Sequence, residues 1–559
     1  MRIEFARCQP AKRYLTLRPS ARFAAITLFL ALVACGAPER NKILTTLDPD
    51  AGYRFHTVSH GSRDDTLVVM TMSGGGTRAA ALATGALEGL HHAAFNDDAR
   101  LDSEIDILST VSGGTVAGAW YTLHGFDGLG AFKEGLLFHN LFGELLRTGA
   151  NPVNLARLPT PSYSRIDWLI AALEKRLFKN NERYSLLVDS PAQRPFLIIN
   201  AGDMTAETVF PFTQDRFDLI CSDLASVKLS HAVAASAAFP VAFTAVTLTN
   251  FSPCIAQTNT WGANPPGWII NPVGSSPYTQ VSSRRQALRE WEYLNRRYPD
   301  DFENYGKSPG GKDWSRPLPK DERRQYIHLL DGGIADNLGL SEPLRLVTSN
   351  NSPAEMVGAD GARKILPQAI CEGDIRSIVF VVVNARSDRR STLDQQATPP
   401  GILSMLFGAT SSSIDGTTFG LLERLDTDLR SLITLRDGCS DDDLKSLTVH
   451  RVPVDFDYIG DPVCRHNFQN IETSWNLDEE VIEALIKVGS GLVSVGLTDA
   501  KSLDPREDRP RPSAVEPPKN TMVSAVERLN LTLKGPMRGT AAIEDACTTL
   551  TEHIASGNG

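Results

Sequence analysis

Short apolar runs, each followed by glycines or by a helical pattern, recur along this chain of 559 residues. The runs have the length of strands, and their lack of polar positions is typical of strands buried on both faces of a sheet. The expected strands are residues 67–72, 105–108, 327–330, 375–384 and 446–455. Patterns of small and apolar residues at 79–90 and 115–121 predict helices after the first two strands. Strands that alternate with helices in this way indicate an α/β protein.

The turn between the second strand and its helix carries a serine. Ser112 precedes Gly113 and Gly114 there, and Asp106 interrupts the apolar run of the strand. A serine on a strand-to-helix turn directs its hydroxyl at the helix N-terminus, where backbone N–H groups and the helix dipole favour a developing negative charge. The turn is therefore a candidate nucleophile elbow, and an ordinary Ser-Gly-Gly turn is the alternative.

Three consecutive glycines, Gly74, Gly75 and Gly76, separate the first strand from its helix. Glycines tolerate positive φ, so several N–H groups can point into one small space and bind an anion. That anion is either a phosphate or the oxyanion of an acyl-transfer reaction. No Lys-Ser or Lys-Thr pair follows at P-loop spacing, and Ala79 stands where a dinucleotide fingerprint needs its third glycine. A connector without a ligand is the alternative.

An aspartate ends the strand at 327–330. Asp331 is followed by Gly332 and Gly333, and the carboxyl ends of strands are where α/β enzymes place reactive groups. Asp-Gly-Gly is also a common turn. We call Gly74, Gly75 and Gly76 the glycine nest. The nest, the elbow serine and the aspartate are informative only as an ordered set.

Together these segments resemble the patatin-like phospholipase family. The resemblance is carried by SGGGTR at 73–78, TVSGG at 110–114, SHAVAASAAFPVAF at 230–243, DGG at 331–333 and a C-terminal segment at 465–489. It implies a three-layer α/β/α sandwich with a mostly parallel central sheet and long inserted loops. It also implies a serine lipid acyl hydrolase that cleaves fatty-acyl esters of phospholipids or lysophospholipids through an acyl-enzyme.

The resemblance assigns roles to individual residues. Ser112 would be the nucleophile and Asp331 its partner in a Ser-Asp dyad, while the oxyanion hole would comprise the N–H groups of Gly74, Gly75, Gly76 and Gly113. Burial would raise the pKa of the aspartate toward working pH. Arg78 occupies the basic position of the family, either to attract a phosphate head group or to pair with a carboxylate and hold the loop.

Two positions depart from the family pattern, since Thr110 replaces the usual glycine before the elbow and Ser73 precedes the glycine triplet. Both changes affect fine geometry and remove no reacting group. A histidine could serve as the base in place of Asp331. Histidines near such segments are, however, more often surface or core residues. The histidines near these segments are His91, His92, His231 and His328.

The N-terminus has the features of a bacterial lipoprotein signal. Basic residues precede the apolar stretch 23–34, which is shorter than the about 20 residues of a membrane span. The stretch ends in Leu-Val-Ala before Cys35, so we expect acylation of Cys35 and a lipid-anchored protein in the cell envelope. Gly36 favours the outer membrane. A plain signal peptide with a chance cysteine is the alternative, and no other segment is expected to span a membrane.

Composition narrows the possible partners. A net charge of −10 argues against nucleic acid and against electrostatic adhesion to anionic lipid. Cysteines spaced for a metal are lacking, so neither metal nor cofactor is expected. Six cysteines beyond Cys35 can form disulfides in an oxidising compartment, with the pairing open. They are Cys221, Cys254, Cys371, Cys439, Cys464 and Cys547.

The expected organisation is a signal peptide at 1–34, an anchor-proximal linker at 35–65 and a hydrolase domain at 66–500. Inserts are expected at about 251–324 and 387–442, and the segments 251–324 and 399–413 are the candidate lids over the site. A Pro-rich linker at 501–521 and a helical tail at 522–559 follow. The other functions considered are a general carboxylesterase or thioesterase on soluble esters, and a catalytically silent envelope scaffold.

Overall fold

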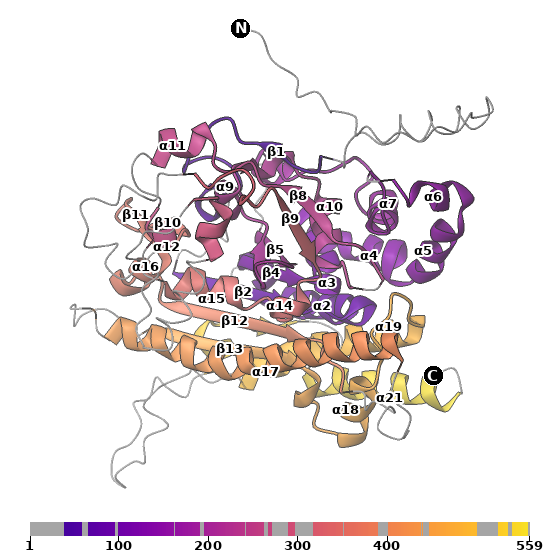
Figure 1. Cartoon of the computed structure of the whole chain (residues 1–559). Helices are drawn as coiled ribbons and strands as arrows, with labels where there is room; N and C mark the ends of the chain where they lie inside the picture. Colours follow the sequence, from indigo (N-terminus) through magenta and orange to yellow (C-terminus); the bar gives the residue numbers. More distant parts are fainter. Residues whose placement is uncertain are drawn as a thin grey trace, which may run out of the picture.

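An eight-stranded sheet runs through the middle of the computed structural model (Figure 1). Seven strands follow the order β13-β12-β2-β4-β5-β9-β8, and β6 pairs with β5. The strands from β13 to β5 are parallel, whereas β6 and β9 run antiparallel to β5. Their bounds are β2 Thr66–Met72, β4 Ile105–Val111, β5 Phe196–Asp203, β6 Thr208–Pro211, β8 Val246–Thr249, β9 Tyr326–Leu330, β12 Ser377–Asn384 and β13 Thr448–Asp455.

The structure describes residues 39–58, 65–95, 99–160, 162–189, 195–240, 242–261, 266–270, 289–296, 317–349, 352–388, 401–437, 439, 447–499, 524–534 and 539–556. The predicted signal peptide and the Pro-rich linker at 501–521 therefore lie outside the described residues.

Helices cover both faces of the sheet, which confirms the three-layer α/β/α architecture. One layer contains α2 Gly76–His91, α3 Ser112–His124, α7 Ile166–Arg176, α10 Leu229–Ser236 and α19 Glu479–Asp499. The other contains α14 Gly333–Asp336, α15 Ser341–Thr348, α16 Leu366–Glu372 and α17 Ile402–Asp437.

Shorter elements surround these layers. The remaining helices are α4 Leu129–Phe132, α5 Leu141–Ala150, α6 Pro152–Arg157, α8 Ser185–Asp189, α9 Gln214–Leu219, α11 Ile255–Trp261, α12 Gly267–Ile270, α18 Pro462–Gln469, α20 Ala525–Arg528 and α21 Gly539–Ala555. Three small antiparallel pairs complete the fold: β1 Lys42–Ile43 with β7 Ser222–Asp223, β3 Ala93–Ala94 with β14 Thr532–Leu533, and β10 Glu355–Val357 with β11 Arg363–Ile365.

The helix α19 is long and apolar enough to cross a membrane. The sequence pattern predicted no such segment beyond the N-terminus. It packs between α2 and α21, and most of its apolar window is buried. Glycines allow the contact with α2, because a Cβ on Gly85 would lie 2.0 Å from the Ile486 carbonyl oxygen. In this structure α19 is a core helix of the sandwich.

The predicted strands are confirmed with shifts of one to three residues at their ends. The strand predicted at 105–108 continues to Val111, directly before the elbow. Asp106 is tolerated in this buried strand because its carboxylate accepts a hydrogen bond from the Val68 N–H at 2.8 Å, where the register between β2 and β4 shifts. A buried polar group with a partner avoids most of the desolvation cost.

The two predicted inserts contain more structure than loops. The described parts of 251–324 include α11, α12 and the buried side chains of Trp291 and Tyr293. The Tyr293 hydroxyl donates to Asp203 at the end of β5, 2.6 Å away. Within 387–442 lies the 36-residue helix α17. A lid function of either segment stays a prediction.

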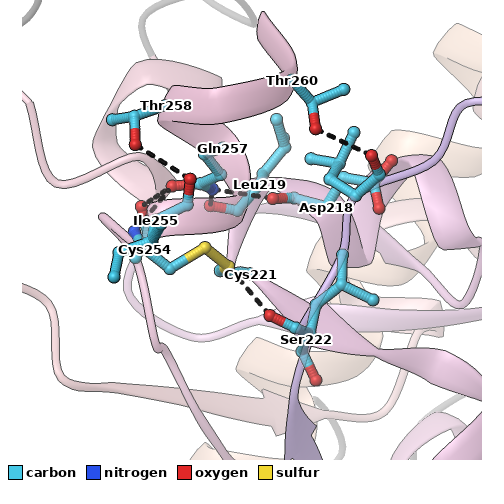
Figure 2. The surroundings of a disulfide bond; sticks show 12 residues. Asp218, Leu219, Cys221, Ser222, Cys254, Ile255, Gln257, Thr258 and Thr260 are labelled. Carbon is cyan, nitrogen blue, oxygen red and sulfur yellow. Dashed lines mark hydrogen bonds between the residues drawn. A yellow bond between two sulfur atoms is a disulfide. The ribbon is translucent and has the colours of Figure 1, made fainter.

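Three disulfides join segments that are distant in sequence. They are Cys221–Cys254, Cys371–Cys439 and Cys464–Cys547. The first holds the start of α11 beside the turn after α9, where the Gln257 side chain donates to the carbonyl oxygens of Asp218 and Leu219 (Figure 2). The third links α18 to α21, so it fixes the C-terminal helix to the rest of the domain.

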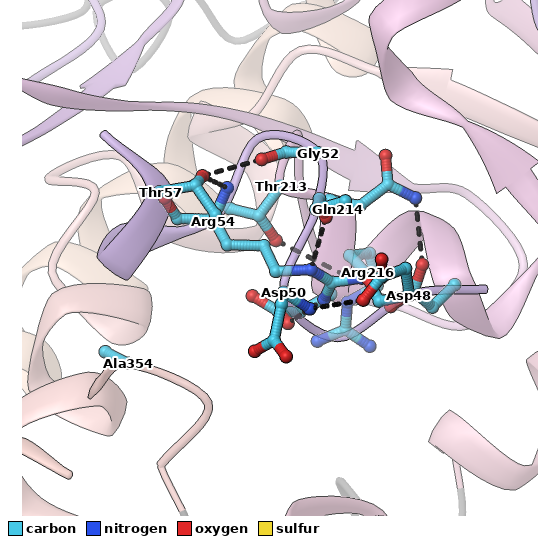
Figure 3. A network of polar contacts seen from close by, with 12 residues as sticks. Asp48, Asp50, Gly52, Arg54, Thr57, Thr213, Gln214, Arg216 and Ala354 are labelled. Atoms are coloured by element: carbon cyan, nitrogen blue, oxygen red, sulfur yellow. Dashed lines mark hydrogen bonds and ion pairs between the residues drawn. The ribbon is translucent and has the colours of Figure 1, made fainter. Parts of the chain in front are cut away.

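The segment before β2 enters the core through a buried arginine. Arg54 donates to Asp215 at 2.5 Å and to Asp218 at 2.7 Å, both on α9. Figure 3 shows Arg54 within the network of polar contacts of this segment. Burial raises the pKa of Asp218 to about 7, although Arg54 acts in the opposite direction. Tyr53 and Phe55 flank this arginine and are buried in the main core. The region expected as a linker therefore contributes to the packed domain over its described residues.

Candidate active site

The elbow serine occupies a strained turn at the N-terminus of α3. Ser112 has φ of 48°, a left-handed value that L-residues rarely adopt outside constrained sites. Its N–H donates to the Ser236 Oγ at 2.8 Å, and that hydroxyl donates to the Asn200 carbonyl oxygen at 2.7 Å. The end of β4, the neighbouring strand β5 and α10 thus hold the turn in place.

The side chains of Ser112 and Asp331 are in direct contact. The Ser112 Oγ donates to the Asp331 Oδ2 at 2.9 Å, and the Gly333 N–H donates to the other carboxylate oxygen at 2.8 Å. Both residues are nearly enclosed, with 6% and 5% of their surfaces exposed. The geometry is that of a nucleophile with a base within hydrogen-bond reach.

Burial raises the pKa of Asp331 to about 6, while the hydrogen bonds from Gly333 and Ser112 lower it. Desolvation penalises the carboxylate more than these two donors stabilise it. A carboxyl group with such a pKa is ionised at neutral pH and is a stronger base than an exposed aspartate.

Asp331 reaches the elbow on an antiparallel strand, not on a parallel one. Gly202 of β5 pairs with Leu330, and the chain of β9 runs from the carboxyl edge of the sheet inward. The Asp331 N–H donates to the Ala238 carbonyl oxygen at 3.0 Å. The aspartate is therefore delivered beside Ser112 by a strand that enters the sheet from the side of the active site.

The glycine nest lies against the elbow. Gly75 and Gly76 have φ of 140° and 60°, and a Cβ on Gly113 would lie 2.1 Å from the Gly76 carbonyl oxygen. The N-termini of α2 and α3 therefore meet at the serine, and the first N–H groups of a helix have no acceptor inside it. This convergence suits a developing oxyanion.

Gly74 differs from the expectation. Its N–H donates to the Asn337 carbonyl oxygen at 3.0 Å, so it is occupied in holding the nest to the loop after α14. The oxyanion donors that remain as candidates are the N–H groups of Gly75, Gly76 and Gly113.

Arg78 is buried beneath the nest, which it holds in place without the carboxylate partner expected for it. Its guanidinium donates to the carbonyl oxygens of Ala385 at 2.8 Å and Ile471 at 2.5 Å. Burial lowers its pKa to about 10. The side chain holds the nest to the ends of β12 and of the segment after α18, through carbonyl oxygens in place of the expected carboxylate.

The two departures from the family pattern have compensating partners. Thr110 fits under the elbow because Gly118 faces it, where a Cβ would lie 2.5 Å from the threonine methyl group. Ser73 accepts a hydrogen bond from the Ala385 N–H at 2.8 Å and so links the nest to the strand β12.

Two residues at the site were not singled out from the sequence. Ser236 lies within the 230–243 segment, and its hydroxyl supports the elbow. Asn337 lies six residues after Asp331, and its Oδ1 is the atom nearest to where Cβ atoms on Gly74 and Gly333 would be, 2.6 and 2.8 Å away. The sequence signal that could have identified Asn337 was its position shortly after the DGG segment at 331–333.

The candidate histidines make contacts elsewhere. His91 contacts the Asp102 carboxylate at 3.1 Å, and His328 contacts Thr247 at 3.0 Å. His231 lies on α10, where burial lowers its pKa to about 3. The Lys534 N–H donates to the carbonyl oxygen of His92. Over the described ranges, no group of three or more His, Cys, Asp or Glu residues could hold a metal ion.

Comparison with known proteins agrees with this geometry. Residues 70–253 match the family model described as patatin-like phospholipase. The search of curated proteins returned no match. A structure of the human GIVD cytosolic phospholipase A2 is similar at 13% identity and a TM-score of 0.26, over 57% of this chain and 43% of that one. This chain thus spans less than half of that protein, and a similarity this low assigns neither fold nor function.

The family match covers the nest, the elbow and the segment around Ser236, and it supports lipid acyl hydrolase activity. Asp331 lies beyond the matched residues, so its contact with Ser112 is an independent observation. The chain carries a patatin-like phospholipase domain.

Proposed function

We propose that the protein is a serine lipid acyl hydrolase that cleaves fatty-acyl esters of phospholipids or lysophospholipids through a Ser112–Asp331 dyad. The observation that carries the proposal is the 2.9 Å hydrogen bond between these two side chains beside the glycine nest. The left-handed turn at Ser112 supports it, because such strain is typical of functional sites.

The proposed reaction has two halves. The Ser112 Oγ attacks the ester carbonyl carbon while its proton passes to Asp331, and the N–H groups of Gly75, Gly76 and Gly113 bind the oxyanion. Asp331 then protonates the departing alcohol, which leaves an acyl-Ser112 ester. A water molecule attacks this ester with Asp331 again as the base, and the fatty acid departs as the proton returns to Ser112.

A serine-reactive probe tests whether the site is active. A fluorophosphonate should label the wild-type protein at Ser112, and a panel of phospholipids and lysophospholipids should release fatty acid. A soluble carboxylesterase would hydrolyse short esters and spare the lipids. Labelling at another serine, or a complete lack of labelling, would contradict the proposal and favour a silent scaffold.

The pH profile should follow Asp331. Because burial raises its pKa to about 6, kcat/KM should fall about tenfold per pH unit below that value as the base becomes protonated, and should level off above it. The measurement is hydrolysis of a soluble ester between about pH 4 and 9. A profile that stays flat down to pH ~4.5 would show that Asp331 is not the base.

We also propose that the protein is anchored to the bacterial cell envelope, on the outer membrane, by an acyl chain on Cys35. The support is the basic start, the short apolar stretch and the small residues before this cysteine. A lipid substrate and a lipid anchor would both place the protein at a membrane.

Replacing Cys35 by serine should prevent acylation, because the serine hydroxyl cannot replace the thiol that receives the lipid. The variant should leave the detergent phase in a phase-partition experiment and should not incorporate a fatty-acid probe. Cys8→Ser is the matched control, and it should behave like the wild type. Equal partitioning of Cys35→Ser and wild type would refute the anchor.

A further inference from the structure

One small region of the surface concentrates large apolar side chains. Phe142 and Leu146 on α5, with Val153 and Leu155 on α6, are 52%, 58%, 65% and 49% exposed. No other described stretch of this length has more than two such side chains. The opposite side of α5 is buried through Leu141, Leu145 and Gly149. We call the outer surface of these two helices the α5–α6 face.

The charge of the α5–α6 face differs from that of the whole protein. Arg147 and Arg157 are exposed on it. Glu144 is the acid between residues 142 and 157, and its carboxylate accepts hydrogen bonds from Lys175 at 2.6 Å and Arg176 at 2.5 Å. The surface is therefore locally basic although the chain carries a net charge of −10. Apolar side chains with a basic rim are the pattern of a helix at the surface of an anionic bilayer.

The proposed anchor joins the body next to this face. Arg40 donates to Asp167 of α7 at 2.7 Å. Arg40 lies five positions after Cys35, a distance of at most about 18 Å in extended chain. The helix α7 packs on α5, where a Cβ on Gly149 would lie 2.8 Å from the Trp168 ring (Figure 1). An acyl chain on Cys35 would hold this side of the protein close to the membrane.

The chain after α10 contacts both the dyad and the start of α7. The Ala238 carbonyl oxygen accepts a hydrogen bond from the Asp331 N–H, and the Thr244 hydroxyl donates to Ser164 at 2.8 Å. Phe239 and Pro240 on this segment are partly exposed. One short segment thus connects the base of the dyad to the helix that supports the α5–α6 face.

We propose that the α5–α6 face is the surface that docks the anchored protein flat on a phospholipid bilayer and presents the active site to it. The inference rests on the proposed lipid hydrolase function and on the anchor, and it adds the orientation. Phe142, Leu146, Val153 and Leu155 enter the apolar boundary, while Arg147, Arg157 and Lys175 contact anionic head groups.

Photolabelling tests the orientation directly. The full-length Ser112→Ala protein is bound to vesicles of phosphatidylcholine and phosphatidylglycerol that contain a phosphatidylcholine with a diazirine in its acyl chain. After irradiation, labelled peptides should come from residues 142–157. Labels confined to other parts of the protein, or to the N-terminal segment alone, would overturn the proposal. Because this variant lacks the nucleophile, the result does not depend on whether the enzyme hydrolyses lipid.

A matched pair of variants tests the consequence for activity. Val153 and Val463 both follow the proline that begins a helix, and both are 65% exposed, but Val463 lies on α18, away from the face (Figure 1). Val153→Glu should lower kcat/KM on vesicles about tenfold and leave that for a short soluble ester unchanged. Val463→Glu should change neither. Equal losses for both variants on vesicles, or an unaltered Val153→Glu enzyme, would refute the docking surface.

Discussion

Ser112→Ala and Asp331→Asn should each abolish ester hydrolysis, with kcat reduced by about 10⁴-fold or more. The alanine variant has no nucleophile, and the asparagine variant has no group that can accept the serine proton. Since the two side chains act as one unit across a 2.9 Å hydrogen bond, the double variant should be hardly slower than either single one. The measurement is the single-turnover release of fatty acid.

Variants of the histidines provide the contrast. His91→Ala and His328→Ala should retain activity, because these rings contact Asp102 and Thr247 and not the serine. If either variant folds but loses hydrolysis while Asp331→Asn keeps most of it, the base is a histidine and the dyad is wrong.

The stability of Asp331→Asn distinguishes loss of the catalytic base from loss of the folded structure. The pKa of Asp331 in the folded protein, about 6, lies above the ordinary value of 3.8. The aspartate therefore contributes less stability as pH rises through this range, and its ionised form disfavours folding at neutral pH. Asp331→Asn removes this ionisation and should be more stable than wild type at pH ~8 by up to about 3 kcal/mol. The advantage should disappear below pH ~4.

The parts of the site that the sequence predicts are those encoded locally. A buried strand followed by glycines and a small-residue helix specifies both the nest and the elbow, because each consists of residues adjacent in the chain. Asp331 was predicted from its place at a strand end, although β9 proved to be antiparallel to β5. Asp331 still contacts Ser112, because a strand of either direction can place its last residue at the same point of the sheet.

What the sequence did not predict depends on partners far along the chain. Gly74 is occupied by the Asn337 carbonyl oxygen, and Arg78 by carbonyl oxygens more than 300 residues away. Six cysteines allow many pairings, and spacing alone does not choose among them. The burial of Trp291 in the core was not predicted, because this residue lies in a Pro- and Gly-rich segment whose composition indicates a loop. Tertiary contacts decide each of these cases.

Arg54→Met should cost about 3–5 kcal/mol of unfolding free energy at pH ~8, because it leaves the buried carboxylates of Asp215 and Asp218 without their cation. Burial already raises the pKa of Asp218 to about 7, and loss of Arg54 would raise it further. A carboxyl group with a raised pKa in the folded state destabilises the protein as pH rises, so the deficit of the variant should shrink toward pH ~5, where Asp218 is protonated. Arg363→Met is the control, since Arg363 pairs with the exposed Asp50 and its loss should leave the free energy of unfolding almost unchanged. Urea unfolding at both pH values measures the difference. An Arg54→Met variant no less stable than the control, or a deficit that does not depend on pH, would show that the ion pair does not hold the N-terminal segment to α9.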